Sequence, residues 1–243
     1  MCTVTYIPGE KASFTLTSNR DENAARSPQN ITQVEQNGIQ LTFPRDTMAG
    51  GTWIAVSNNN KVVCLLNGAF AKHKHQPPYK KSRGIMVLDF FNYDKAEGFF
   101  DGFGFDGMEP FTMVIYDQGR LFEFRWDEKQ RHIQPLDLSK KYIWSSSTLY
   151  DHEAKARRKQ WFADWLEGRT EFHEEAILDF HQNAGDGDPW NDVIMNRDGL
   201  VQTVSITQIA KLPKHIELSY YDLLNQQQKQ AKILLQGEVV ESH

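Results

Sequence analysis

Polar and hydrophobic residues alternate at the start of the chain, where Thr3 and Thr5 are interleaved with Val4 and Tyr6. A turn containing Pro-Gly follows at residues 8–11, and a second alternating run occupies residues 13–17. Alternation with a period of two is typical of a strand that buries one face, and Pro-Gly is a turn signal. The pattern predicts a β-hairpin that brings residues 18–22 back beside the N-terminus.

Similar β-prone runs recur through the rest of the chain and predict further strands. They occupy residues 39–43, 53–57, 61–67, 111–116, 120–126, 132–135, 141–145, 199–210 and 215–222. The remainder of residues 23–47 is polar and predicts a surface loop. The run at residues 61–67 is apolar at consecutive positions, which indicates burial on both faces and places Cys64 in the core.

Apolar residues at helical spacing predict helices at residues 82–91, 151–167 and 170–182. Ser82 is the expected N-cap of the first helix. In the second helix, the apolar side carries Trp161, Phe162 and Trp165, and the polar side carries Arg157, Arg158 and Lys159. Strands, two amphipathic helices and more strands predict a mixed α+β chain.

Composition limits the classes of protein that fit. The 243 residues are 40% hydrophobic and contain no evident linker, so we expect a single domain spanning residues 1–243. A formal net charge of −5 argues against a general nucleic-acid binder. No apolar run predicts a membrane span, and no signal peptide is evident. The chain has only two cysteines, Cys2 and Cys64, so we expect no disulfide framework. We expect a reducing, cytoplasmic location instead.

Cys2 directly follows the initiator methionine, and this position gives it special chemistry. If Met1 is removed, which the small cysteine side chain should permit, Cys2 carries both a thiol and a free α-amine. A thiol titrates near about 8.5 and an α-amine near about 7.7–8.0, so part of the amine can take the thiol proton at neutral pH. Cys2 is therefore a candidate nucleophile with its own general base.

The predicted hairpin brings Arg20 and Asp21 close to Cys2. A nearby cation favours a thiolate, so Arg20 would lower the pKa of the Cys2 thiol, whereas Asp21 would hold the amine. The spacing leaves a structural alternative open, in which Asp21 caps a short helix and Cys2 is a buried first residue.

Asn67 is a polar residue at the end of an apolar strand. A buried amide needs a hydrogen-bond partner, which would be either a substrate or the turn that begins at Gly68. The basic segment 72–83 predicts a mobile loop or, alternatively, a lid that attracts an anionic substrate group. His73 and His75 lack a third ligand nearby in the sequence, so no metal site is predicted.

Three features together resemble the NRDE family, described as transport and Golgi organisation protein 2-like: Cys2, the run Ser18-Asn19-Arg20-Asp21-Glu22, and Gly50-Gly51-Thr52-Trp53. That family in turn resembles cysteine-type N-terminal nucleophile hydrolases such as choloylglycine and penicillin V acylases. The resemblance implies a four-layer αββα sandwich of two stacked antiparallel sheets.

The resemblance also implies roles for individual residues. The catalytic positions would be Cys2, Arg20, Asp21 and Asn67, with Asn67 donating to the oxyanion of the tetrahedral intermediate. The substrate-binding candidates are Asn19, Trp53 and Ser146. Two positions depart from the family pattern. Ser146 stands where an Asn is expected, and segment 202–205 lacks an expected Arg, for which Arg197 is a candidate substitute.

Our leading hypothesis is an N-terminal cysteine hydrolase that acts on a non-peptide amide or related acyl compound and needs no cofactor. The alternative is a catalytically inactive sandwich that binds a lipid-like or cofactor ligand in the same cleft. A third hypothesis is a scaffold with no small-molecule site. The two departures from the family pattern motivate the second hypothesis.

Overall fold

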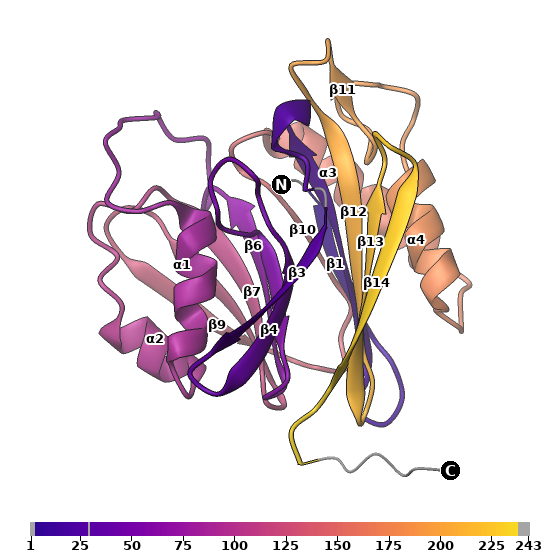
Figure 1. Ribbon diagram of the computed structural model, residues 1–243. Coiled ribbons are helices and arrows are strands. Elements are labelled where there is room, and N and C mark those ends of the chain that lie inside the picture. Colours follow the sequence, from indigo (N-terminus) through magenta and orange to yellow (C-terminus); the bar gives the residue numbers. More distant parts are fainter. Residues whose placement is uncertain (1–2, 29, 238–243) are drawn as a thin grey trace.

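The computed structural model describes residues 3–28 and 30–237, in which two antiparallel sheets pack face to face between two pairs of helices (Figure 1). The helices are α1 (Arg83–Asp89), α2 (Ala96–Gly102), α3 (His152–Leu166) and α4 (Glu174–Asn183), with short 3-10 turns η1 (Ala24–Arg26) and η2 (Phe90–Asn92). Helices α1 and α2 cover one sheet, and α3 and α4 cover the other (Figure 1). This arrangement confirms the predicted αββα sandwich.

The first sheet contains the two ends of the described chain. Its strand order is β10-β1-β2-β12-β13-β14, and β11 pairs with β12. The strands are β1 (Thr3–Pro8), β2 (Phe14–Glu22), β10 (Tyr142–Ser145), β11 (Asn196–Arg197), β12 (Val201–Lys211), β13 (His215–Asp222) and β14 (Gln227–Leu234). The first strand therefore lies inside the sheet, between β2 and β10.

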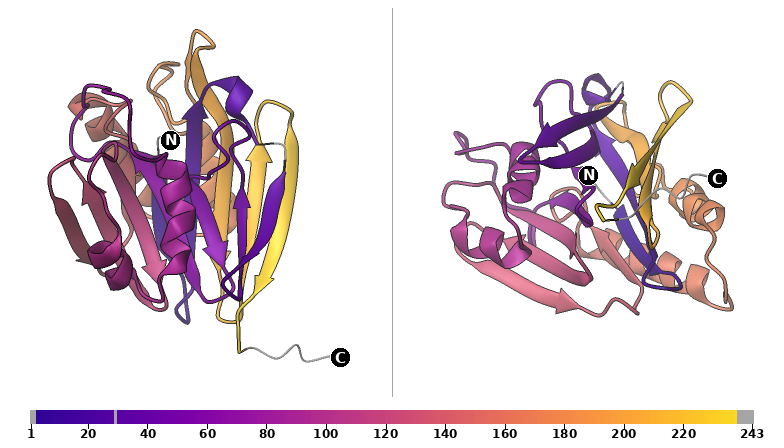
Figure 2. Two further views of the ribbon diagram at one scale, coloured as in Figure 1. Left: turned by 60° about the vertical axis from the view of Figure 1, so that its left-hand side comes forward. Right: turned by 60° about the horizontal axis from the view of Figure 1, so that its bottom comes forward.

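The second sheet is a meander in which each strand pairs with the next in the sequence. Its strands are β3 (Ile31–Gln36), β4 (Ile39–Pro44), β5 (Ile54–Ser57), β6 (Lys61–Asn67), β7 (Phe111–Asp117), β8 (Arg120–Trp126) and β9 (Arg131–Leu136). Further views show the two sheets as separate layers (Figure 2). Cys64 on β6 is fully buried, as predicted.

Alternation along β1 and β2 divides their side chains between the two faces of the first sheet. Val4, Tyr6 and Leu16 belong to the hydrophobic core between the sheets. Thr3 and Thr5 face the other way and contact the helix layer through hydrogen bonds to Arg158 and His181. Consecutive residues of these strands thus reach different layers of the molecule.

The strand prediction was incomplete at the sheet edges. Residues 23–47 contain not only β4 but also β3, and β14 follows the last predicted strand. Both are edge strands with mixed or polar composition, ITQVEQ and QQKQAKIL. Their hydrophobic signal is weak because they are fixed by backbone pairing to one neighbour more than by burial.

Helix α2 was also missed, because Gly98 and Gly102 disfavour a helix. Tertiary packing outweighs this local cost. Phe99 and Phe100 are buried against the second sheet, with ring centroids 6.1 and 5.0 Å from that of Phe124. Helix α4 begins at Glu174, later than predicted. Ser82 precedes α1 as expected, but within the described ranges its side chain makes no capping hydrogen bond.

His181 on α4 joins the helix layer to β1 and β2. The Asn19 side-chain amide donates to the carbonyl oxygens of His181 (2.9 Å) and Val193 (3.2 Å), so its side-chain oxygen accepts from His181 Nδ1. Nε2 of the neutral ring then accepts from the Thr5 hydroxyl at 2.7 Å. Burial, followed by the charge of Arg158, lowers the pKa of His181 to about 3. The folded protein therefore holds a neutral imidazole.

Acid should destabilise the fold through His181. Its pKa is about 3 in the folded protein and about 6.5 in the unfolded chain, so the unfolded chain binds more protons between these values. The free energy of unfolding should fall as the pH drops below about 6.5, with a slope from this group approaching about 1.4 kcal/mol per pH unit. Urea unfolding of wild type and His181→Gln between pH 7 and 4 measures it. Equal slopes in the two proteins would contradict the prediction.

Candidate functional site

Cys2 lies outside the described residues, so the candidate site is built from the residues around the start of β1. Thr3 is the first of these. It pairs with Asn19 of β2 on one side and with Ser145 of β10 on the other. The N-terminal end of β1 is thus held between two strands that carry three of the predicted site residues at or next to this level: Asn19, Arg20 and Ser146.

Arg20 and Asp21 lie on opposite faces of β2, because they are consecutive residues of one strand. The Arg20 guanidinium stacks over the Trp53 ring at 4.1 Å and bonds Asp46 at 2.5 Å. The Asp21 carboxylate faces the helix layer, where it accepts hydrogen bonds from Tyr150 (2.7 Å) and Thr203 (2.6 Å). The two predicted catalytic residues therefore do not line one common pocket.

The pair of Arg20 and Asp46 is almost completely buried, with side chains 3% and 5% exposed. Burial lowers the pKa of Arg20, although Asp46 opposes this shift. Burial alone would raise the pKa of Asp46. The backbone N–H of Ala49 and the charges of Arg20 and Arg26 together lower it instead. Arg20 thus carries a charge that is already balanced.

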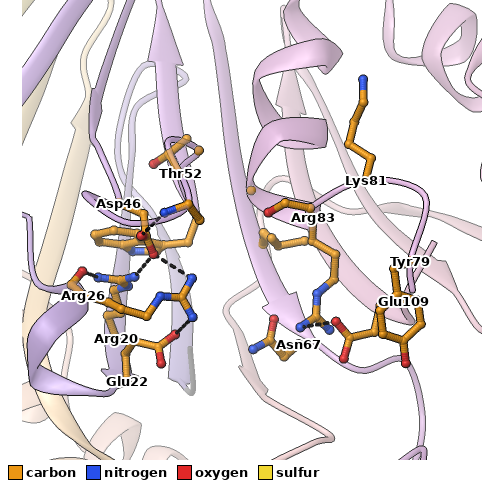
Figure 3. A pocket seen from close by; sticks show the side chains of 16 residues that line it. Arg20, Glu22, Arg26, Asp46, Thr52, Asn67, Tyr79, Lys81, Arg83 and Glu109 are labelled. Carbon is orange, nitrogen blue, oxygen red and sulfur yellow. Dashed lines mark hydrogen bonds and ion pairs between the residues drawn. The ribbon is translucent and has the colours of Figure 1, made fainter. Parts of the chain in front are cut away.

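A cavity of about 310 Å³, which we call the Arg20 cavity, brings together Arg20, Trp53 and Asn67. Figure 3 shows Arg20 and Asp46 on one side of it and Arg83 and Glu109 on the other, with Asn67 between them. Arg83 and Glu109 form an ion pair at 2.9 Å. Arg26 and Lys81, the other cations of the lining, also contact carboxylates. Positive charge in this cavity is therefore neutralised by built-in partners.

Asn67 and Ser146 are linked at the end of the sheets. The backbone carbonyl of Asn67 accepts from the Ser146 hydroxyl (2.9 Å) and from the backbone N–H of Ser147 (3.1 Å). Among the residues that the structure describes, none hydrogen-bonds the Asn67 side-chain amide, which lines the Arg20 cavity. That amide is the group available to a ligand there.

The Gly50-Gly51-Thr52-Trp53 segment has a structural explanation. Gly50 has a φ of +70°, and a methyl group at Gly51 would lie 2.3 Å from the carbonyl carbon of Gly84. The absence of a side chain at Gly51 therefore lets the chain before β5 lie against the start of α1. Thr52 donates its hydroxyl to Pro44 and Ile54 carbonyls. This fixes the segment that presents Trp53 to Arg20.

Arg158 is the main residue that the sequence analysis misplaced. It was assigned to the polar, solvent-facing side of its helix, yet it is fully buried. Its guanidinium donates to the backbone carbonyls of Asn191 and Asp192 and to the Thr3 hydroxyl, and it stacks on Tyr150 at 3.6 Å. Loop carbonyls distant in sequence supply these acceptors, so the helical pattern contains no signal for this burial.

A second cavity of about 1080 Å³ extends along β10, and we call it the β10 cavity. Its lining includes Leu66, Ser145 and Ser147, together with Arg125 and Lys155. Leu66 lies between Leu65 and Asn67, both of which line the Arg20 cavity. The two cavities therefore flank the end of β6, close to the N-terminal end of β1. No pattern in the sequence had indicated the β10 cavity.

The described residues contain neither a metal-binding cluster nor a helix that could span a membrane. No group of three or more His, Cys, Asp or Glu side chains there is arranged to hold a metal ion. His73 instead contacts Glu109 at 3.0 Å. Within residues 3–28 and 30–237, no helix combines the length and the apolar character needed to cross a membrane.

Replacing Arg158 by Met should lower the free energy of unfolding by about 2–4 kcal/mol, because buried carbonyls and the Thr3 hydroxyl would lose their donor. Arg157→Met is the matched control. Its exposed pairs with Asp186 and Asp188 at 3.3 Å should contribute little. Denaturant unfolding of both variants compares them. Similar losses in the two would show that Arg158 does not have the structural role assigned to it.

Solved structures share this fold at low sequence identity. The Caenorhabditis elegans ortholog of N-acylethanolamine-hydrolyzing acid amidase is 13% identical, with a TM-score of 0.59 over 86% of this chain and 92% of that chain. Two variants of conjugated bile acid hydrolase from Clostridium perfringens are each 10% identical, with TM-scores of 0.51 and 0.52. They cover 98% and 99% of this chain and 100% of their own. At such identities the likeness establishes the fold alone.

Sequence comparison assigns the family. No curated protein matches the chain. The family model described as Transport and Golgi organisation 2 matches residues 1–230, which is almost the whole chain. The chain therefore belongs to the Transport and Golgi organisation 2 family.

Proposed function

We propose that this protein is an N-terminal cysteine hydrolase that cleaves a non-peptide amide or a related acyl compound, with Cys2 as nucleophile once Met1 is removed. The observation that carries the proposal is the register of β1, in which Thr3 pairs with Asn19 and Ser145. Thr3 directly follows Cys2 in the sequence, and Arg20 and Ser146 directly follow its two partners. The candidate residues of β2 and of the end of β10 therefore gather where the described part of β1 begins.

Two further observations support the proposal. The similar folds belong to proteins named as hydrolases, one of which is an amidase. In addition, Asn67, which lines a cavity, is hydrogen-bonded through its carbonyl to Ser146, and Ser146 follows the residue that pairs with Thr3. An amide donor is thus available close to the described start of β1.

In the proposed reaction the Cys2 amine takes the thiol proton, and the sulfur attacks the carbonyl carbon of the substrate. A C–S bond forms, and the oxyanion accepts a hydrogen bond from the Asn67 amide. The C–N bond then breaks, and the Cys2 ammonium gives its proton to the departing amine. Water attacks the thioester, releasing the carboxylic acid and restoring the thiol.

The hydrogen bonds and ion pairs of Arg20 and Asp21 determine what each residue can do in the proposed reaction. In this proposal Asp21 holds the α-amine that remains after Met1 is removed. Its bonds to Tyr150 and Thr203 would orient it there. Because Arg20 is paired with Asp46, it would act on a thiolate as part of an ion pair, more weakly than a lone cation. Arg20 also positions Trp53 at the cavity.

An acyl-directed electrophile such as a β-lactone should modify Cys2 and spare Cys64. The buried Cys64 is an internal control, because burial raises the pKa of its thiol to about 12. Mass spectrometry of the native protein should find Met1 absent and one adduct, on the N-terminal peptide, and none in Cys2→Ala. Retained Met1, or no adduct on folded wild-type protein, would refute the proposal.

Asn67→Ala should lower kcat by about 10²–10³-fold if Asn67 donates to the oxyanion. A fluorogenic amide, N-decanoyl-7-amino-4-methylcoumarin, would report turnover. Asn58→Ala, in the turn between β5 and β6, is a control outside the site. An unchanged kcat in Asn67→Ala would remove Asn67 from the mechanism.

The volume of the β10 cavity and its apolar walls favour one alternative, a sandwich that binds a lipid-like ligand without cleaving it. Such a protein would keep its ligand in Cys2→Ala. It would also show no turnover in any variant. Turnover that depends on Cys2 separates the two functions.

A further inference from the structure

The β10 cavity has an excess of positive charge. Its lining includes five basic residues but only two carboxylates, Glu123 and Asp151, although the whole chain has a formal net charge of −5. The basic residues are Lys72, Arg125, Lys155, Lys159 and Arg197. A concave surface focuses the potential of such charges and attracts anions.

Both carboxylates already accept hydrogen bonds from other groups of the protein, although the Asp151 charge still acts on Lys155 and the Lys159 charge on Glu123. Glu123 accepts two hydrogen bonds from Arg125, at 2.7 and 3.0 Å, and one from Trp144 Nε1 at 2.6 Å. Asp151 caps α3 by accepting from the backbone N–H of Ala154 at 2.9 Å. Both acidic groups are thus already occupied by donors of the fold.

Lys155 is the half-buried member of the basic group. Its ammonium donates to the Ser147 hydroxyl (2.8 Å) and the Phe70 carbonyl (3.2 Å), both neutral groups. Within the described parts of the chain, no carboxylate lies within 4.0 Å of the Lys72, Lys155 or Lys159 ammonium groups. Burial, and then the charges of Arg125 and Lys159, lower the pKa of Lys155. The Arg20 cavity, where each cation has a carboxylate partner, is the contrasting case.

The rest of the lining is suited to an apolar group. Leu66, Phe70, Leu136 and Trp144 contribute hydrophobic surface to the same cavity. Ser145 and Ser147, on either side of Ser146, also line it. The cavity therefore combines apolar side chains, cations without an ion-pair partner among the described residues, and a border along β10, the neighbour of β1.

We infer that the β10 cavity binds the anionic end of the substrate, and that the substrates of this protein are acidic amides with an apolar body. The group recognised is an oxyanion such as a carboxylate or phosphate. The assignment of an amide rests on the proposed function, whereas the preference for an anion rests on the β10 cavity alone. A bound oxyanion would supply the partner that Lys155 and Lys159 lack in the fold.

The test uses two amides that differ in charge, N-decanoyl-β-alanine and the neutral N-decanoyl-3-aminopropanol. Calorimetry on Cys2→Ala measures binding without turnover. The acidic amide should bind at least about tenfold more tightly, and this preference should weaken as salt is added. N-decanoyl-O-phosphoethanolamine, compared with the carboxylate, shows which oxyanion is preferred.

Variants made on the Cys2→Ala background identify the residues that cause the preference for the acidic amide. Lys155→Met and Lys159→Met remove one charge each and should each reduce the preference several-fold, whereas Lys155→Arg should retain it. Lys129→Met is a matched control, because Lys129 is exposed and lies outside the β10 cavity. Equal affinity for acidic and neutral amides, or a preference that survives both Lys155→Met and Lys159→Met, would overturn the inference.

The outcomes also separate this inference from the proposed function. Hydrolysis of both amides by wild type without a charge preference would overturn the inference and leave the hydrolase standing. Anion-dependent binding with no hydrolysis by wild type would support the anion site and count against the hydrolase.

Discussion

The alternation of side chains along β2 is the constraint on which the rest of the site depends. A strand sends consecutive residues to opposite faces, so Arg20 must enter the space toward the second sheet while Asn19 and Asp21 must enter the helix layer. Each of these residues then binds a different part of the chain. Arg20 holds the segment around Asp46 and Trp53, and Asp21 holds Tyr150 and Thr203. Strand β2 thus connects the first sheet to the segment around Asp46 and Trp53 on one face and to the helix layer on the other.

The two cavities beside β6 differ in how their charges are balanced, and this difference separates structural charges from charges available to a ligand. Arg20 and Arg83 in the Arg20 cavity have carboxylate partners, so adding an anion there would compete with existing ion pairs. Among the described residues, the hydrogen-bond acceptors of Lys155 in the β10 cavity are two neutral oxygens, those of Ser147 and Phe70. An anion would add an interaction there without displacing one. Charge balance therefore points to the β10 cavity, although the sequence motif points to Arg20.

The fold could be predicted, and candidate site residues could be named, because their signals are local or belong to a motif. Alternation identified β1 and β6, and the run containing Arg20 and Asp21 together with Cys2 indicated the family and the sandwich. Arg158 and the β10 cavity could not be predicted in this way. The burial of Arg158 depends on carbonyl groups of a loop more than thirty residues later. The cavity likewise combines Lys155 of α3 with Arg125 of β8, and only the tertiary fold brings them together.

The outer face of β1 and β2 is polar although it is buried, and this composition makes physical sense as a means of fixing the register. Thr3, Thr5, Asn19 and Asp21 are each at most 2% exposed, and apolar residues there would avoid the cost of desolvating polar groups. A one-residue slip of β2 against its partners would send Asn19 and Asp21 into the core between the sheets and Arg20 into the helix layer. His181 would then lose its hydrogen bond with Asn19, and Tyr150 and Thr203 would lose theirs with Asp21. Because unsatisfied buried groups are costly, the polar face strongly favours one register. A nucleophile at the end of β1 needs its neighbours within hydrogen-bonding distance, so a single register is the property that the proposed chemistry requires.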